Sequence, residues 1–457
     1  MTALNGFCSF VHSFDSLYWE RICSVMAHKA SADGDKSKIY CKGNLHFSLP
    51  FGGSFAEEGK YICVFTGGIS NCKTLKEKLL DMGIKTEENF ASVFLNIYKS
   101  LGARGIGLIF GEFCSFVWDS EKEKLLLFKD KAGTKSLYYA YVNKRFVFSS
   151  SVNGILRFPG VYAKLSPKGI YNMLENASCL DPFCTAFEDI KRIPPGSVAE
   201  FTGEGVKIKC YCSLNPADKF NSEFIARDAI RIRGGKEVAL NKATDKLQTV
   251  ISALDSVDVC GFPAYPPVYA FLSLIKTEKE QKLSFPFLPP EFKVPDFGFL
   301  LKDDIIKEAR KNNYVPLSVQ KNILGMSVYF DDEIKRLLTG RMKLKINTCY
   351  PLWWESFDSY SSLCQKEITL PLADGRFLEC VADGGGENYI YNKEISLPDC
   401  DYVRKILLNE LSKGKRTMFA FLDSRKVYDC IFDTDSVLSL LYILQLDYWS
   451  HKLKVTL

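Results

Sequence analysis

Short apolar runs and helical apolar spacings alternate along the first 205 residues of the chain. Leucines at helical spacing predict a helix over residues 71–82, and a similar apolar stripe predicts a second helix over 90–101. Residues 110–119 and 125–139 are typical of two strands and a turn. Further apolar runs predict strands over 7–11, 61–65, 146–149 and 198–201. The first half is therefore expected to fold as short strands and turns with two helices.

The order of elements changes after a polar stretch, residues 215–224, which we interpret as a linker. An apolar stripe then predicts a helix over 237–256, and an apolar run predicts a strand over 257–262. A second helix is expected over 268–277. This alternation is typical of a parallel α/β sheet.

The length of the chain favours two domains, because 457 residues exceed what one ordinary core accommodates. A proline-rich loop is expected over 285–295, and most of the chain beyond residue 295 favours helices, the last of them over 436–449. We place the first domain at residues 1–212 and the second at residues 222–457.

Composition and charge narrow the class of protein. Apolar residues make up 47% of the chain and charged residues 25%, as in ordinary globular proteins. The net charge of +5 is spread over both signs without a basic block, so no specific nucleic-acid partner is expected. No apolar run reaches membrane-spanning length, and the first residues show no signal-peptide pattern.

Cysteine usage points to a reducing environment. The 16 cysteines are scattered without a C-x-x-C pair, and the chain has only four histidines. Neither a metal site nor a secreted disulfide framework is expected, and buried free thiols fit this pattern better. We therefore expect an intracellular protein, located in the cytoplasm or, as an alternative, in a mitochondrion or another organelle.

Two runs carry a family resemblance. Residues 110–119 read F-G-E-F-C-S-F-V-W-D, and residues 125–139 read L-L-L-F-K-D-K-A-G-T-K-S-L-Y-Y. They resemble the glutaminase domain of glutamine-dependent asparagine synthetases, in which G-[DE]-F-A-F-x-x-W-D is followed by R-D-x-x-G-x-K-P-L-Y-Y. The resemblance implies a four-layer αββα fold of the Ntn-hydrolase type. It also implies a reduced second domain that is α/β, helix-rich and similar to adenine-nucleotide hydrolases. We interpret the residues kept in the two runs as structural, because glycine and aspartate set turns and aromatic side chains fill cores.

The position of the catalytic nucleophile has changed. Members of the family begin with a C-G-I-x-G run, whose cysteine attacks glutamine with its own α-amine as the base. The matching run is N-G-F-C-S-F, which places Asn5 at that position, and an amide is not a nucleophile. Cys8 is the rival nucleophile if cleavage exposes it, and Thr2 becomes N-terminal if Met1 is removed. We interpret Cys8 as a core thiol and Thr2 as an ordinary processed end.

The residues that hold glutamine in the family have changed as well. The family's N-G-E run, which supplies an oxyanion donor and a ligand for the glutamine amine, corresponds here to Thr66, Gly67 and Gly68. The run that carries the carboxylate-binding arginine has no arginine and contains His46. Phe90 lies near the position of a glutamine-binding aspartate. An uncompensated carboxylate in a buried pocket is costly, so these changes together predict that the site does not hydrolyse glutamine.

The nucleotide loop of the second domain is altered too. In the family, an S-G-G-x-D-S loop surrounds the pyrophosphate of ATP with backbone N–H groups. Aligning residues 257–262 with the family's strand gives a loop made of Pro263, Ala264, Tyr265, Pro266 and Pro267. Proline has no N–H donor, and the alternative register, with residues 252–256 on the loop, lacks both glycines. We interpret the acidic glycine cluster 383–387 as a surface turn, and we expect no ATP, metal or other cofactor to bind.

These observations predict a catalytically inactive relative of asparagine synthetase that acts as a structural or partner-binding subunit. Its partners would be other protein subunits, in a heteromeric assembly with an active paralogue or in a large organellar complex. The rival interpretation is an active, ATP-dependent amidotransferase that uses Cys8 or ammonia from another source. A third interpretation is a small-molecule sensor, which needs an open cleft between the two domains. We expect Trp353 and Trp354 to pack in the core.

Overall fold

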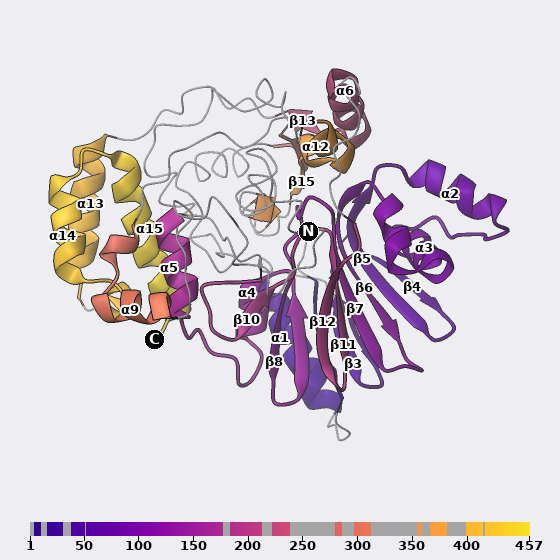
Figure 1. Cartoon of the computed structure of the whole chain (residues 1–457), viewed down its shortest axis with the longest axis horizontal. Coiled ribbons are helices and arrows are strands. Elements are labelled where there is room, and N and C mark those ends of the chain that lie inside the picture. Colours follow the sequence, from indigo (N-terminus) through magenta and orange to yellow (C-terminus); the bar gives the residue numbers. More distant parts are fainter. Residues whose placement is uncertain are drawn as a thin grey trace.

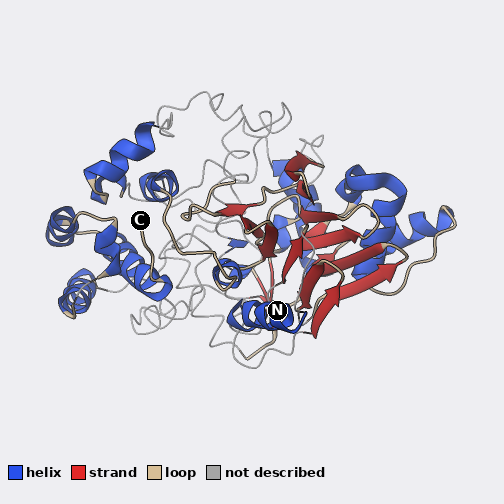
Figure 2. Cartoon of the chain, turned by 90° about the horizontal axis from the view of Figure 1, so that it is seen from below, coloured by secondary structure: helices blue, strands red, loops and turns tan. Residues whose placement is uncertain are grey.

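The computed structural model describes thirteen stretches of the chain: residues 4–10, 16–30, 38–50, 52–176, 183–212, 222–237, 279–285, 297–311, 354–355, 357–358, 366–381, 399–414 and 416–457. The described strands of the first half gather at one end of the molecule, and the C-terminal helices lie at the other (Figures 1 and 2). Among the described residues, no helix is long and apolar enough to cross a membrane.

Two six-stranded antiparallel sheets form the first half. The first sheet has the order β10 (Ile190–Arg192), β8 (Tyr138–Val142), β9 (Arg145–Ser149), β1 (Asn5–Ser9), β3 (Leu45–Leu49) and β2 (Lys38–Lys42). The second sheet has the order β12 (Gly205–Cys210), β11 (Ser197–Thr202), β7 (Lys124–Lys129), β6 (Gly111–Asp119), β5 (Tyr61–Ile69) and β4 (Ser54–Glu58). The strands expected from the apolar runs of the first half are present, with shifts of a few residues at their ends.

The sheets stack face to face over an aromatic core. Phe116 of the second sheet lies between Phe47 and Phe148 of the first, with ring centroids 5.1 and 5.4 Å away. On the far side of the second sheet, α2 (Cys72–Asp81) and α3 (Phe90–Gly105) cover a separate apolar cluster. On the far side of the first sheet lie α1 (Ser16–Ala30) and α4 (Val152–Leu156). The result is two antiparallel sheets between helices, with Asn5 on β1, as the sequence predicts.

Local signals explain the two helices that the sequence predicts. The side chain of Asn89 accepts a hydrogen bond from the backbone N–H of Ser92 at 2.8 Å and so caps the start of α3. Gly83, with a φ of 76°, follows the end of α2, where a left-handed residue is favoured. The prediction missed α1, α4 and α5 (Pro167–Asn176). Helices α1 and α4 pack against each other and against the first sheet, and α5 packs against α9, so their stability comes from tertiary contacts.

A three-stranded parallel sheet comes next, made of β13 (Lys236–Glu237), β14 (Lys282–Ser284) and β15 (Glu367–Thr369). The helix expected over 237–256 is therefore wrong at its first residue, because Glu237 pairs with Ser284 as a strand. This long-range pairing overrides the helical pattern. Likewise α6 (Ser222–Arg233) begins inside the stretch interpreted as a linker. Several predicted elements lie outside the described residues: the helix 237–256 beyond its first residue, the strand 257–262, the helix 268–277, most of the loop 285–295 and the cluster 383–387.

Short helices complete the second half. The loops near the parallel sheet carry η5 (Pro371–Ala373) and α12 (Gly375–Val381), and α12 packs against α6. The helical end of the molecule contains η3 (Gly298–Leu300), α9 (Asp303–Lys311), α13 (Cys400–Ser412), η7 (Thr417–Ala420), α14 (Ser424–Asp433) and α15 (Val437–Leu453). The helix expected over 436–449 is α15, and it is buried on nearly all sides. The first half also contains a short 3-10 helix, η1 (Ile106–Leu108), directly after α3.

The two ends of the molecule are joined by packing and hydrogen bonds. The backbone N–H of Leu165 donates to the carbonyl oxygen of Thr456 at 2.7 Å, and Phe297, which stacks on Tyr442 at 4.8 Å, donates its N–H to Leu174 of α5. Helix α5 consequently lies beside the C-terminal helices (Figure 1). Trp354 is buried in the same large apolar cluster, as expected, and Trp353 lies outside the described residues.

Candidate functional site

Asn5, which the sequence predicts to occupy the family's nucleophile position, is an interior strand residue. It is fully buried and pairs with Ser48 of β3 on one side and with Ser149 of β9 on the other. The hydroxyl of Ser149 donates to the Asn5 Oδ1 at 2.5 Å. A Cβ atom at Gly154 would come within 2.3 Å of the same oxygen, so α4 closes over it. The side chain of Asn5 thus acts as a hydrogen-bond acceptor inside the fold.

The backbone around Asn5 is also engaged. Leu4, the residue before it, donates its N–H to the Ser150 Oγ at 3.0 Å, and its carbonyl oxygen accepts from the Ser150 N–H at 2.8 Å. The backbone hydrogen bonds to β9 and the residues after it therefore include Leu4, which precedes Asn5. The nitrogen of residue 5 is a peptide nitrogen and not an amine. A peptide nitrogen cannot act as the general base that this mechanism requires.

Cys8, the rival nucleophile, lies in the core between the two sheets and has no solvent exposure. Burial, and secondarily the charge of Glu123, raises the pKa of its thiol far above the ordinary value. A thiol attacks as its thiolate, so this environment suppresses its reactivity. Thr2 lies outside the described residues.

His46, at the position of the carboxylate clamp, is buried on β3. Its ring stacks on Phe7 with a centroid distance of 4.7 Å, and the two residues are Cα partners across the strand pair. Burial lowers the pKa of the imidazole, so the neutral form dominates at neutral pH. A neutral, stacked ring does not replace the charge of an arginine.

Three of the five residues predicted to mark the glutamine pocket line one cavity. Gly67, Gly68 and Phe90 face a cavity of about 190 Å³. Its opposite wall comes from the second half of the chain, through α6, β14 and β15. The cavity also has charged walls, with Glu112 and Lys135 from the first half and Lys282 and Glu367 from the second.

The remaining two pocket residues, His46 and Thr66, do not line this cavity. The Thr66 hydroxyl donates to the backbone carbonyl of Cys114 at 3.1 Å. Gly67 has a φ of +113°, and a Cβ there would lie 1.9 Å from the carbonyl oxygen of Glu112. Glycine at this position is therefore dictated by backbone packing.

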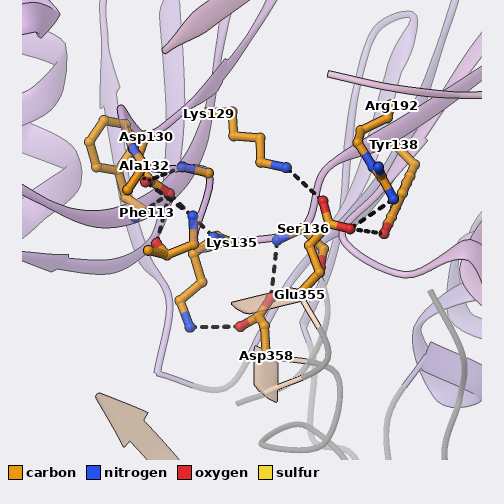
Figure 3. A network of polar contacts seen from close by, with 12 residues as sticks. Phe113, Lys129, Asp130, Ala132, Lys135, Ser136, Tyr138, Arg192, Glu355 and Asp358 are labelled. Carbon is orange, nitrogen blue, oxygen red and sulfur yellow. Dashed lines mark hydrogen bonds and ion pairs between the residues drawn. The ribbon is translucent and has the colours of Figure 1, made fainter. Parts of the chain in front are cut away.

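A network of buried charges, drawn in Figure 3, lies next to this site, and the sequence did not reveal it. Glu355 is 1% exposed and meets three partners from the two sheets. Its carboxylate accepts from the Lys129 Nζ at 2.8 Å and from the Tyr138 hydroxyl at 3.0 Å, and it forms an ion pair with Arg192 at 3.0 Å. Burial alone would raise the pKa of Glu355, but Arg192 and Lys129 together hold it below its usual range.

A second carboxylate of the same segment binds the adjacent loop. Asp358 accepts from the Lys135 Nζ at 2.6 Å and from the Ser136 backbone N–H at 3.2 Å. Figure 3 shows Asp358 and Glu355 projecting from one segment toward the two halves of the network. Lys129 and Lys135 fall in the retained run 125–139, but nothing in the sequence around Glu355 or Asp358 indicates their role.

Asp130, another residue of the retained run, builds the loop that carries Lys135. Its buried carboxylate accepts from the backbone N–H groups of Ala132, Gly133, Thr134 and Lys135 at 2.8–3.2 Å. Burial raises its pKa, and these hydrogen bonds act in the opposite direction. These contacts match the structural role proposed for the retained residues. Among the described residues, no group of three or more metal-ligating side chains is present.

Comparison with known proteins gives a family match for part of the first half. Residues 51–212 match the family model of the glutamine amidotransferase domain. Asparagine synthetase [glutamine-hydrolyzing] 3 of Bacillus subtilis is 24% identical over 165 residues, which are 36% of this chain and 27% of that protein. A putative asparagine synthetase [glutamine-hydrolyzing] 2 of Methanocaldococcus jannaschii is 33% identical over 98 residues, covering 21% of this chain and 18% of that protein.

Among solved structures, the glutamine phosphoribosylpyrophosphate amidotransferase of B. subtilis matches with 10% identity, a TM-score of 0.34 and coverage of 68% of this chain and 64% of the other. The match to the two synthetases spans less than a third of the length of either. The family model covers the part of the chain that carries most of the strands and the motif runs described above. Residues 51–212 therefore match the glutamine amidotransferase domain family, and asparagine synthetases are among the proteins that this chain resembles.

Proposed function

We propose that this chain is a catalytically inactive asparagine synthetase-like protein that serves as a structural or partner-binding subunit of a larger assembly. The observation that carries the proposal is the state of Asn5. Residue 5 supplies neither a nucleophile nor an amine, and its side chain is occupied by the 2.5 Å hydrogen bond from Ser149. Chemistry that begins with an N-terminal thiolate has no starting group here.

The surroundings of Asn5 support the same proposal. Cys8 is enclosed between the sheets, and the His46 ring stacks on the Phe7 ring of the neighbouring strand β1. The rival interpretation, an active ATP-dependent amidotransferase, requires Cys8 to become an exposed chain end. That change would remove Asn5, Gly6 and Phe7 from β1 and with them most of its pairing to β3 and β9.

An ammonia-release assay with glutamine tests the catalytic part. We expect the purified chain to release no ammonia above buffer, with an active glutamine amidotransferase as the positive control. Cys8→Ala is the matched variant, because it removes the rival thiol from a fully buried position. Ammonia release by the wild type that disappears in this variant would overturn the proposal and establish the rival.

Purification of the native protein tests the subunit part. A stable, specific protein interface typically buries about 1,200–2,000 Å² in total. We expect the native chain to elute with other subunits in fixed stoichiometry, identified by mass spectrometry and confirmed by cross-links to described surface lysines such as Lys207. Elution as a lone monomer at several concentrations would contradict this role.

The cavity between the two halves favours a second candidate, a small-molecule sensor. An open volume of about 190 Å³ with walls from both halves is the feature that this function needs. Phe90→Trp should fill part of the cavity, while Leu80→Trp, at an exposed position on α2, is the control. A panel of amino acids screened by thermal shift would support a sensor only if a shift is seen with the wild type and the control and is lost in Phe90→Trp.

A further inference from the structure

The residues around the former nucleophile position form a row across the first sheet. Asn5 pairs with Ser149, Ser149 pairs with Tyr138, and Tyr138 pairs with Arg192. Asn5 and Tyr138 are the first residues of their strands, whereas Ser149 and Arg192 are the last of theirs. The row therefore marks one end of the sheet, and the side chains of Tyr138 and Arg192 stand at that end.

The second sheet has a corresponding row. Thr66 pairs with Cys114, and Cys114 pairs with Lys129, the last residue of β7. Lys129 has no solvent exposure, so its charge needs a partner inside the protein. Each sheet thus has a buried cation at this end, Lys129 on the second sheet and Arg192 on the first.

Glu355 joins these two rows. One of its carboxylate oxygens meets Lys129 of the second sheet, and the other meets Tyr138 and Arg192 of the first (Figure 3). Asp358 binds Lys135 and Ser136 in the loop that connects the two sheets between β7 and β8. Trp354 and Phe357 of the same segment are buried as well, at 2% and 3% exposure.

We propose that Trp354, Glu355, Phe357 and Asp358 form an internal plug that closes the end of the β-sandwich at which Asn5 lies, with Glu355 as the counter-ion that holds the two sheets together there. The plug comes from the second half of the chain, with Glu355 226 residues after Lys129. It is independent of the proposed loss of catalysis, because a closed end and a missing nucleophile are separate properties. It assigns the second half a role in completing the glutamine amidotransferase domain.

Site-specific thiol labelling of the full-length protein tests the plug. Cys114 lies in the row of Lys129 and faces the core between the sheets, while Cys63, on β5 of the same sheet, faces the covering helices. Both thiols are buried. Opening of the plug should expose Cys114 and leave Cys63 protected, and mass spectrometry of the labelled peptides reads the two rates separately.

The variants are Glu355→Gln and Asp358→Asn, each nearly unchanged in shape and without the charge. The control is Glu57→Gln, since Glu57 pairs with Lys42 at 2.9 Å where both side chains are 40% exposed. We expect Glu355→Gln to raise the labelling rate of Cys114 by about tenfold or more relative to Cys63, because Lys129 and Arg192 lose the carboxylate charge that they share. Asp358→Asn should raise it less, and the control should leave both rates unchanged.

Two outcomes would overturn the plug. One is an unchanged rate at Cys114 in both variants. The other is an equal rise at Cys114 and Cys63, since that pattern means general unfolding and not local opening. If Glu355→Gln does not fold, Asp358→Asn decides alone, because its ion pair lies nearer the surface, at 8% and 14% exposure.

Discussion

Removal of the Glu355 charge should destabilise the whole protein far more than removal of an exposed charge. In Glu355→Gln, the side chain keeps its size, but Lys129 and Arg192, at 0% and 3% exposure, lose the negative charge that they share. Breaking a buried ion pair by neutralising one partner typically costs about 3–5 kcal/mol. Glu57→Gln, whose pair with Lys42 is 40% exposed on both sides, should cost about 0–1 kcal/mol.

Urea unfolding followed by tryptophan fluorescence measures the difference, because Trp354 lies next to Glu355 and Trp118 lies in the core between the sheets. The pH dependence of this stability difference is an independent check on the role of the Glu355 charge. The pKa of Glu355 is held below its usual range by Arg192 and Lys129 against the opposing effect of burial. An acid with a lowered pKa contributes stability above its unfolded pKa, about 4.3, and this contribution is lost as the pH falls further.

The difference between wild type and Glu355→Gln should therefore be constant from pH 7 to about pH 5 and should shrink below about pH 4. A loss of less than about 1 kcal/mol at pH 7, equal to that of Glu57→Gln, would refute the reasoning. It would mean that water reaches Lys129 and Arg192 and that the plug does not close the sandwich.

Three further predictions concern single positions. Gly67→Ala should lower the melting temperature in a thermal scan by much more than Gly59→Ala. A Cβ at residue 67 would lie 1.9 Å from the carbonyl oxygen of Glu112, whereas a Cβ at residue 59 meets open space. Equal shifts of the two variants would contradict this reason. Asn5→Cys should show no ammonia release from glutamine, since the nitrogen of residue 5 is a peptide nitrogen that cannot act as the base; measurable turnover would count against an inactive site. Calorimetry with Mg-ATP should show no binding, because Pro263, Pro266 and Pro267 lack N–H donors in the expected nucleotide loop. This loop lies outside the described residues. A micromolar affinity would be evidence of a working nucleotide site elsewhere.

Most of the first half could be predicted from the sequence, because its signals are local. The apolar runs predict β1, β5, β6 and β9 within a few residues, and the leucine spacing predicts α2. The predicted loss of the nucleophile at Asn5 and of the arginine near His46 rests on motif positions alone, since the chemistry depends on side-chain type. The burial of Cys8 could be expected from its place within an apolar strand.

Only the tertiary structure shows which residues far apart in the sequence contact one another. Glu237 lies at the start of a helical apolar stripe but forms β13, since its backbone hydrogen bonds are satisfied by β14 across the sheet. The cavity beside Gly67 has walls from segments about 300 residues apart, and no local pattern encodes such a contact. Glu355 illustrates the same limit most clearly. A single carboxylate in a sequence looks like a surface residue, and it becomes the counter-ion of Lys129 and Arg192 only when folding removes all three from water.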